Sequence, residues 1–287
     1  MEPDDLQKYM EQVIRDRNNR PVPDFEGYSP AEMYHLLYFP FGPVSPVRLQ
    51  KMADTDYLQI PLLKQVKYLA SLLAESGEVK LTARGYLPTG LVSDLYAQGF
   101  IKDELIELGL SRLYRETDCM PVNLTRILIE LAGLAKKRKG KLSLTTAAEK
   151  ILPDLDALSR LIFRTFATKF NWAYYDRYGD NQIGQLGMGF SLILLSKYGN
   201  ERQTDGFYAE KYFKAFPDLL NSIETMIGTR EEEAARCYSL RTFERFLDYF
   251  GLISLKKEGQ RWETTKYVMK TGLFDKWVRC VPHRHDL

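Results

Sequence analysis

The chain has 287 residues, of which 45% are apolar and 27% are charged, and its formal net charge is +2. This length and composition are typical of a soluble globular protein with a sizeable core and about two domains. A net charge so close to zero argues against a dedicated nucleic-acid binder. The longest apolar run, near Phe190 to Leu195, is far shorter than the roughly 20 residues that span a bilayer, so we expect no membrane association.

Cysteine usage and the start of the chain indicate a cytoplasmic protein. The three cysteines, Cys119, Cys237 and Cys280, are far apart and odd in number, so a disulfide framework is not expected. The opening residues Met1 to Asp5 are acidic, where a secretory signal would need a basic start and an apolar run.

The first 59 residues are expected to form a helical arm followed by a loop rich in proline and aromatic residues. Residues 4–17 carry apolar side chains at helical spacing, which predicts an amphipathic helix packed on the body of the protein. Ser29 and Glu32 have the spacing of a capping box with proline at the first helical position, so a helix is expected from Pro30 to about Tyr38. The prolines after Phe39 end that helix.

Residues 60–153 are expected to form a first unit, opened by a helix from Pro61 that stops at Gly77. A short strand follows near Val79, and then a helix from Pro88 to Gln98. The unit ends on a helix around Leu124–Leu131, a glycine stop at Gly133, and two strands joined by a basic turn at Gly140, where a tight hairpin needs a positive backbone angle.

This ending recurs when Gly133 is aligned with Gly251. The apolar positions i, i+3, i+4 and i+7 are Leu124, Ile127, Leu128 and Leu131 in the first copy and Phe243, Phe246, Leu247 and Phe250 in the second. We therefore predict that Leu128 and Phe246 are buried at equivalent positions. The outward faces of the two helices are expected to carry Asn123 and Arg126 in one copy and Arg241 and Arg245 in the other.

The second half of the chain also repeats the opening of the first. A helix is expected from Gly187 to Lys197, and the spacing of Gly199 and Thr204 matches that of Gly77 and Thr82. The predicted division is an arm at 1–59, a first unit at 60–153, a connecting helix at 154–182, and a second unit with a tail at 183–287. The predicted fold class is mainly α with short β hairpins.

Positive charge gathers on the two repeated endings. Residues 122–150 contain seven basic and two acidic residues, and residues 238–280 contain nine basic and five acidic ones, so the rest of the chain is acidic. A basic patch on an acidic body can concentrate phosphate at one face. The alternative is that lysines in a hairpin turn simply keep it solvated.

The order helix, strand, helix, helix, basic hairpin resembles the winged-helix superfamily. That resemblance implies binding of double-stranded DNA, or a protein-interaction or scaffold role in the members that do not bind DNA. For DNA binding, the expected contacts are helix-face and hairpin residues: Asn123, Arg126, Lys136, Lys137, Arg138, Lys139, Lys141, Arg241, Arg245, Lys256, Lys257 and Arg261. DNA binding requires both hairpins on one surface, whereas the scaffold alternative expects the outward helix faces to be covered by other parts of the chain.

Three further stretches are similar to an uncharacterised bacterial protein family: Ser29–Met33, Leu36–Phe41 and Lys80–Pro88. Some members of that family carry a cysteine-rich zinc motif at the C-terminus, which this chain lacks. The resemblance implies a bacterial origin and no particular chemistry.

Signatures of catalysis and of cofactor binding are missing from the sequence. There is no nucleophile elbow, zinc-protease helix or phosphate-loop motif, so we expect no enzymatic activity and no cofactor. Cys280, His283 and His285 have side chains that can bind metal, but they lie at the chain end and fall short of the usual four ligands, so no metal site is predicted.

Overall fold

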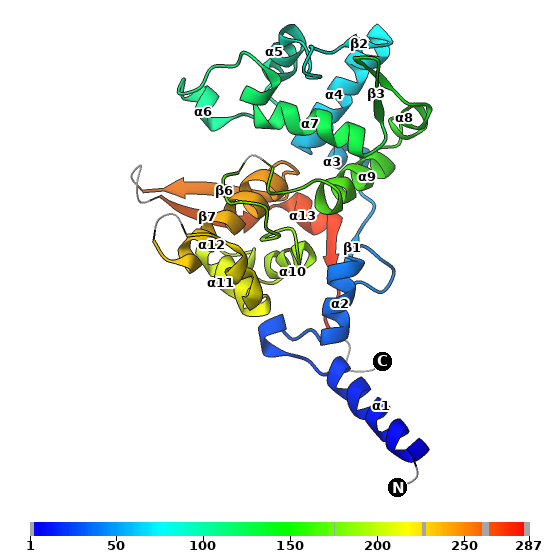
Figure 1. The fold of residues 1–287 in the computed structure, drawn as a ribbon, viewed down its shortest axis with the longest axis vertical. Helices are drawn as coiled ribbons and strands as arrows, with labels where there is room; N and C mark the ends of the chain where they lie inside the picture. Colours follow the sequence, from blue (N-terminus) through cyan, green and yellow to red (C-terminus); the bar gives the residue numbers. More distant parts are fainter. Residues whose placement is uncertain (1–2, 175, 226–227, 260–263, 284–287) are drawn as a thin grey trace. The chain divides into compact units, whose positions relative to one another are not determined.

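The computed structural model describes residues 3–174, 176–225, 228–259 and 264–283 (Figure 1). These residues are mainly helical with small antiparallel sheets, which confirms the predicted fold class at this level. The chain forms two compact units. The central unit comprises residues 51–171 and 249–251, and the composite unit comprises residues 1–50, 172–248 and 252–287. The division predicted from the sequence stays a prediction.

The central unit contains the first predicted helix and hairpin. Its elements are α3 (Asp54–Tyr57), α4 (Pro61–Ser76), β2 (Val79–Lys80), α5 (Thr89–Ala97), α6 (Glu104–Glu107), the 3₁₀ turn η2 (Glu116–Asp118), α7 (Met120–Leu131), β3 (Ala135–Arg138), β4 (Lys141–Leu144), α8 (Thr146–Ile151) and α9 (Leu155–Thr168). The strands form an antiparallel sheet in the order β2-β4-β3. Most of the apolar stripe of α4 is buried. In α7, Leu124 and Leu128 are fully covered as predicted, whereas Ile127 is half-buried and Leu131 is exposed at the end of the helix.

The composite unit combines the two ends of the chain with the second helix and hairpin. Its elements are α1 (Pro3–Asn19), η1 (Pro23–Phe25), α2 (Pro30–Tyr38), β1 (Val47–Leu49), α10 (Met188–Tyr198), β5 (Gln203–Thr204), α11 (Asp205–Ala215), η3 (Pro217–Ser222), α12 (Arg230–Tyr238), η4 (Ser239–Leu247), β6 (Ile253–Glu258), β7 (Thr265–Lys270), α13 (Gly272–Trp277) and β8 (Val278–Cys280). One sheet has the order β5-β7-β6, and β1 pairs with β8.

The two units share one order of elements. In each, a helix, a short strand and further helices lead into a hairpin, and the short strand pairs with the last strand of that hairpin. Gly133 and Gly251 both have positive φ, 72° and 65°, which is the left-handed conformation expected where the helix stops. Phe246 is fully buried, so the predicted burial of the paired core positions is confirmed.

The second copy differs from the first in helix type. The segment η4 is a π-helix that continues directly from α12, and the amide of Asp248 donates to the carbonyl of Phe243 five residues earlier, at 2.9 Å. The sequence predicted an ordinary α-helix here. The aromatic stripe remains buried on one side, so the change in hydrogen bonding leaves the core face in place.

The arm at the N-terminus confirms one prediction and corrects another. The helix α2 begins with the predicted capping box, in which the amide of Ser29 donates to Glu32 at 2.8 Å and the amide of Glu32 donates to the Ser29 hydroxyl at 3.3 Å. The packing expected for the first helix is wrong, because residues 4–20 are all exposed along α1. Helical spacing predicts an apolar face, but it does not say what covers that face.

Candidate nucleic-acid interface

The first hairpin presents a face of cations in the central unit. Side chains alternate along a strand, and Ala135 and Leu142 are buried on one side of the sheet. Lys136 and Arg138 therefore lie on the opposite side, and so does Lys141, the register partner of Arg138. All three are exposed.

The strand register extends this face across all three strands. Lys141 is paired with Arg138 on one side and with Lys80 on the other, so three cations stand in a row across β2, β4 and β3. Like charges directly opposite each other destabilise a sheet. An ion pair between Lys141 and Glu78 compensates one of these charges. We call Lys80, Lys136, Arg138 and Lys141 the hairpin basic face.

Two further hairpin lysines lie beside this face. Lys139 is exposed in the turn with a positive φ of 50°, and Gly140 follows it with a φ of 72°, as a tight hairpin turn requires. The ammonium of Lys137 donates to the carbonyl of Gly85 at 3.3 Å, so this side chain is directed to the loop after β2. The sequence analysis did not select Lys80 as a contact, although Lys80 lies within the short strand predicted at Val79.

The second hairpin is compensated by acidic side chains. Glu244 on η4 lies 3.2 Å from the ammonium of Lys257 and 2.6 Å from that of Lys266. Burial alone would raise the pKa of Glu244, but the two lysines outweigh burial and hold this pKa below its ordinary value. Lys256 is exposed, and Arg261 lies outside the described residues. The two hairpins are therefore not electrostatically equivalent.

The orientation expected for the helix-face residues of α7 is wrong. Asn123 and Arg126 are only 1% and 9% exposed, respectively. Both donate to one carboxylate oxygen of the fully buried Glu116 at 2.5 Å, and Arg126 also pairs with Glu130. The carboxylate of Glu116 reaches α7 from η2, in the connection between α5 and α7. Helical spacing could not predict the contact with Glu116, because the connection between α5 and α7 has no regular periodicity in its sequence.

The corresponding residues of η4 are also held inside their unit. Arg241 is 1% exposed and forms a buried ion pair with Asp176. Its guanidinium also donates to the carbonyls of Gly179 at 3.0 Å and Asn181 at 2.8 Å. Arg245 is half-buried and donates to the carbonyl of Tyr174 at 3.0 Å. The segment after Trp172 therefore covers the face that was expected to meet a groove.

Comparison with known proteins found one protein family whose model matches part of the chain. Residues 59–157 match the family model of the Y4jL N-terminal domain. The matched range includes the hairpin basic face and the helices α4, α5 and α7. This match fits the resemblance to an uncharacterised family drawn from the sequence, and its description states no activity. No curated protein and no solved structure matches the chain.

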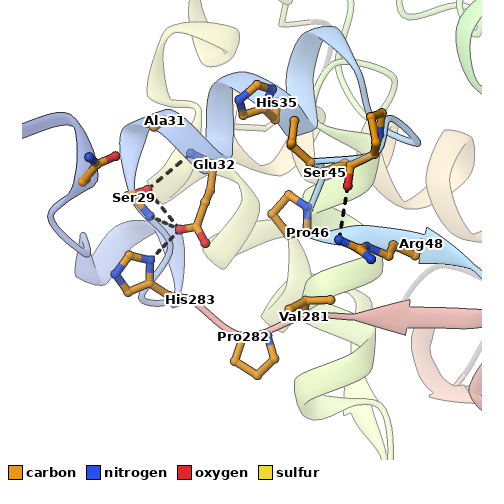
Figure 2. A pocket seen from close by; sticks show the side chains of 13 residues that line it. Ser29, Ala31, Glu32, His35, Ser45, Pro46, Arg48, Val281, Pro282 and His283 are labelled. Carbon is orange, nitrogen blue, oxygen red and sulfur yellow. Dashed lines mark hydrogen bonds and ion pairs between the residues drawn. The ribbon is translucent and has the colours of Figure 1, made fainter. Parts of the chain in front are cut away.

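A second candidate site is a pocket of about 380 Å³ in the composite unit, between α2, the loop before β1 and the segment after β8 (Figure 2). Glu32 lies at its wall, where it caps α2, and its carboxylate lies 2.6 Å from Nδ1 of His283. Arg48 is across the pocket and donates to the carbonyl of Pro43 at 3.2 Å. The carboxylate is thus already used in joining α2 to the C-terminal segment.

Cys280 and His283, the described members of the C-terminal group of possible metal ligands, each contact another part of the composite unit. The thiol of Cys280 lies 3.6 Å from the carbonyl of Leu192, and burial raises the pKa of this thiol to about 12, which disfavours the thiolate that binds metals. His285 lies outside the described residues. Within the described parts of the chain, no group of three or more histidine, cysteine or acidic residues could hold a metal ion. In the same parts, no helix is long and apolar enough to cross a membrane.

Proposed function

We propose that both units are winged-helix-like and that the central unit binds the nucleic-acid backbone through the hairpin basic face. The observation that carries this proposal is the row formed by Lys80, Lys141 and Arg138 across three paired strands. A fold gains nothing from placing like charges directly opposite each other. An anionic partner would relieve that repulsion.

The geometry of the row favours contact with phosphates over contact with bases. Neighbouring strands lie about 4.8 Å apart, so a row across three strands extends over roughly 10 Å. Flexible side chains on such a span can reach several phosphates of one backbone. The helix faces that would read a groove are closed by Glu116 in one unit and Asp176 in the other. Binding should therefore depend on charge and be nearly independent of sequence.

A protein-interaction role is the second candidate, and two observations favour it. The outward helix faces are covered by other parts of the chain, as expected for a scaffold. The connection between α5 and α7 also exposes large apolar side chains, namely Leu105, Leu108, Leu110 and Tyr114, each more than half exposed. Clustered apolar side chains of this kind are typical of protein-binding surfaces.

The test is a titration of labelled random-sequence duplex DNA at several salt concentrations. Each neutralised phosphate adds about 0.9 to the slope of log affinity against log salt, so replacing Lys80, Lys136 and Arg138 with alanine should lower the slope by up to about 2.7. A matched control removes three exposed lysines of the same unit that are outside the sheet: Lys51, Lys64 and Lys169. This control has the same net charge as the test variant.

The outcomes separate the two candidates. The salt dependence of the affinity should be weaker in the hairpin variant and nearly the same as that of the parent in the control. This result would support binding of the nucleic-acid backbone by the hairpin basic face. Equal effects in both variants would show that only net charge matters. If the parent chain does not bind at low salt, the protein-interaction role replaces the nucleic-acid proposal.

A further inference from the structure

The helix α1 carries an apolar stripe that no other part of the described chain covers. Its 17 residues run from Pro3 to Asn19, in dark blue in Figure 1. The stripe consists of Leu6, Tyr9, Met10, Val13 and Ile14, which are 49%, 59%, 55%, 47% and 53% exposed. About half of each side chain therefore remains in contact with water.

An apolar helix face is normally packed against another surface. Most helical stability in proteins comes from packing of such a face and not from helix propensity. The sequence of α1 has such a face, with polar and charged residues on the other side. A surface outside the described chain could bury the half of the stripe that is left exposed.

The distribution of charged residues along α1 indicates which kind of partner fits the helix. Asp4 and Asp5 lie in the first turn, Arg17 lies in the last turn, and Arg20 follows directly. Within the described residues, none of these four side chains has an ion pair. The first turn is thus acidic and unpaired, and the end of the helix is basic and unpaired.

The apolar stripe and the basic end lie on the same side of the helix. At about 100° per residue, Leu6, Met10, Val13 and Arg17 fall within an arc of roughly 60°. When two such helices lie antiparallel and cross between residues 11 and 12, Met10 of each faces Val13 of the other. Arg17 of each then approaches the end of the other helix where Asp5 flanks the stripe, whereas Asp4 lies on the opposite side. The helix dipoles also oppose each other in this arrangement, which is favourable.

We propose that α1 is a dimerisation element that pairs antiparallel with α1 of a second copy of the chain. The same surface is used by both copies, so the contact closes as a two-fold dimer. A lipid surface fits the helix less well. Helices that lie on membranes carry mostly Lys and Arg on the polar face, whereas α1 has four acidic residues and three basic ones.

The area of the stripe sets the expected strength. Five half-exposed side chains of this size leave roughly 400–500 Å² of apolar surface per copy. Two copies together would bury about 900 Å² of apolar surface. This is less than the roughly 1,200–2,000 Å² of a standard stable interface. An interface of this size is expected to be weak, so the dimer should form and dissociate as the concentration of the chain changes.

Sedimentation equilibrium of the full chain from about 1 to 200 μM tests the proposal, with a transition from monomer to dimer expected in that range. The double substitution of Met10 and Val13 to glutamate should weaken the dimer at least tenfold. Lys8→Glu is the matched control, because it changes the charge by the same amount on the opposite side of α1 and should leave the dimer nearly intact. All of these residues are exposed, so urea unfolding should be unchanged in each variant and shows that the fold is retained.

Charge reversal tests the ends of the pair. D5R and R17D should each self-associate at least tenfold more weakly than the parent, and an equimolar mixture should dimerise again. A parent that stays monomeric to 200 μM would overturn the proposal, and so would a dimer unaffected by the Met10 and Val13 double variant. Binding of a monomeric parent to vesicles of phosphatidylcholine and phosphatidylserine would assign the stripe to a lipid surface instead.

Discussion

The buried ion pair between Arg241 and Asp176 gives the sharpest test of how the second helix face is used. Both side chains are fully shielded from solvent. Substituting Arg241 with methionine retains most of the aliphatic volume but leaves the carboxylate of Asp176 buried without a counter-charge. The change also removes the donor to the carbonyls of Gly179, Asn181 and Ile183.

The magnitude follows from these losses. Breaking a buried pair by removing one partner costs about 3–5 kcal/mol, which is a large fraction of the roughly 5–15 kcal/mol that holds a domain folded. Substituting Asp176 with asparagine in the same chain removes the unpaired charge. The double variant should therefore be more stable than the Arg241→Met single variant, with a coupling of about 1–3 kcal/mol.

Urea unfolding followed by tryptophan fluorescence measures this effect in the correct unit. Trp172 and Trp277 lie in the composite unit, and no tryptophan occurs in the sequence of the central unit. With a urea dependence of about 2 kcal/mol per molar, the midpoint should fall by roughly 1.5–2.5 M in the single variant. A midpoint within about 0.3 M of the parent would show that Arg241 is solvated and would restore it as a candidate for groove contact.

Three further predictions concern stability in the composite unit. Phe246→Ala should lower the free energy of unfolding by about 3–5 kcal/mol, because the ring is fully buried 4.7 Å from that of Trp172; an unchanged melt would refute the repeat. Glu244→Gln should cost about 1–3 kcal/mol at pH 7. The folded pKa of Glu244 is lowered, so its contribution is present above the unfolded value of about 4.3 and is lost as pH falls through the folded pKa. Urea midpoints of this variant and the parent should therefore converge as the pH is lowered below about 4.3. A difference that stays constant with pH would show that the ion pairs of Glu244 are not its cause. Ser29→Ala should cost about 1 kcal/mol through loss of the cap on α2, whereas Ser222→Ala, at an exposed position, should cost less than 0.5 kcal/mol in the same urea titration.

Local patterns in the sequence determined where the elements are and which sides of them are apolar. The capping box at Ser29, the glycine stops at Gly133 and Gly251, and the buried positions Leu128 and Phe246 all follow from interactions within a few residues along the chain. The hairpin turn at Gly140 belongs to the same group. Spacing along one element is sufficient for such features, because the helix and strand periods fix which side chains share a face.

Only the tertiary structure showed which polar residues are exposed and could contact a partner. Asn123, Arg126 and Arg241 lie on the polar sides of their helices by spacing, yet Glu116 and Asp176, from irregular segments, bury them. The register of β2 against β4 adds Lys80 to the row of cations, and Glu244 compensates the second hairpin. In each case, the burial or pairing of a polar side chain depends on a segment that is distant in the sequence. The packing of the whole unit brings the two segments together, and the helix and strand periods of a single sequence do not predict such long-range contacts.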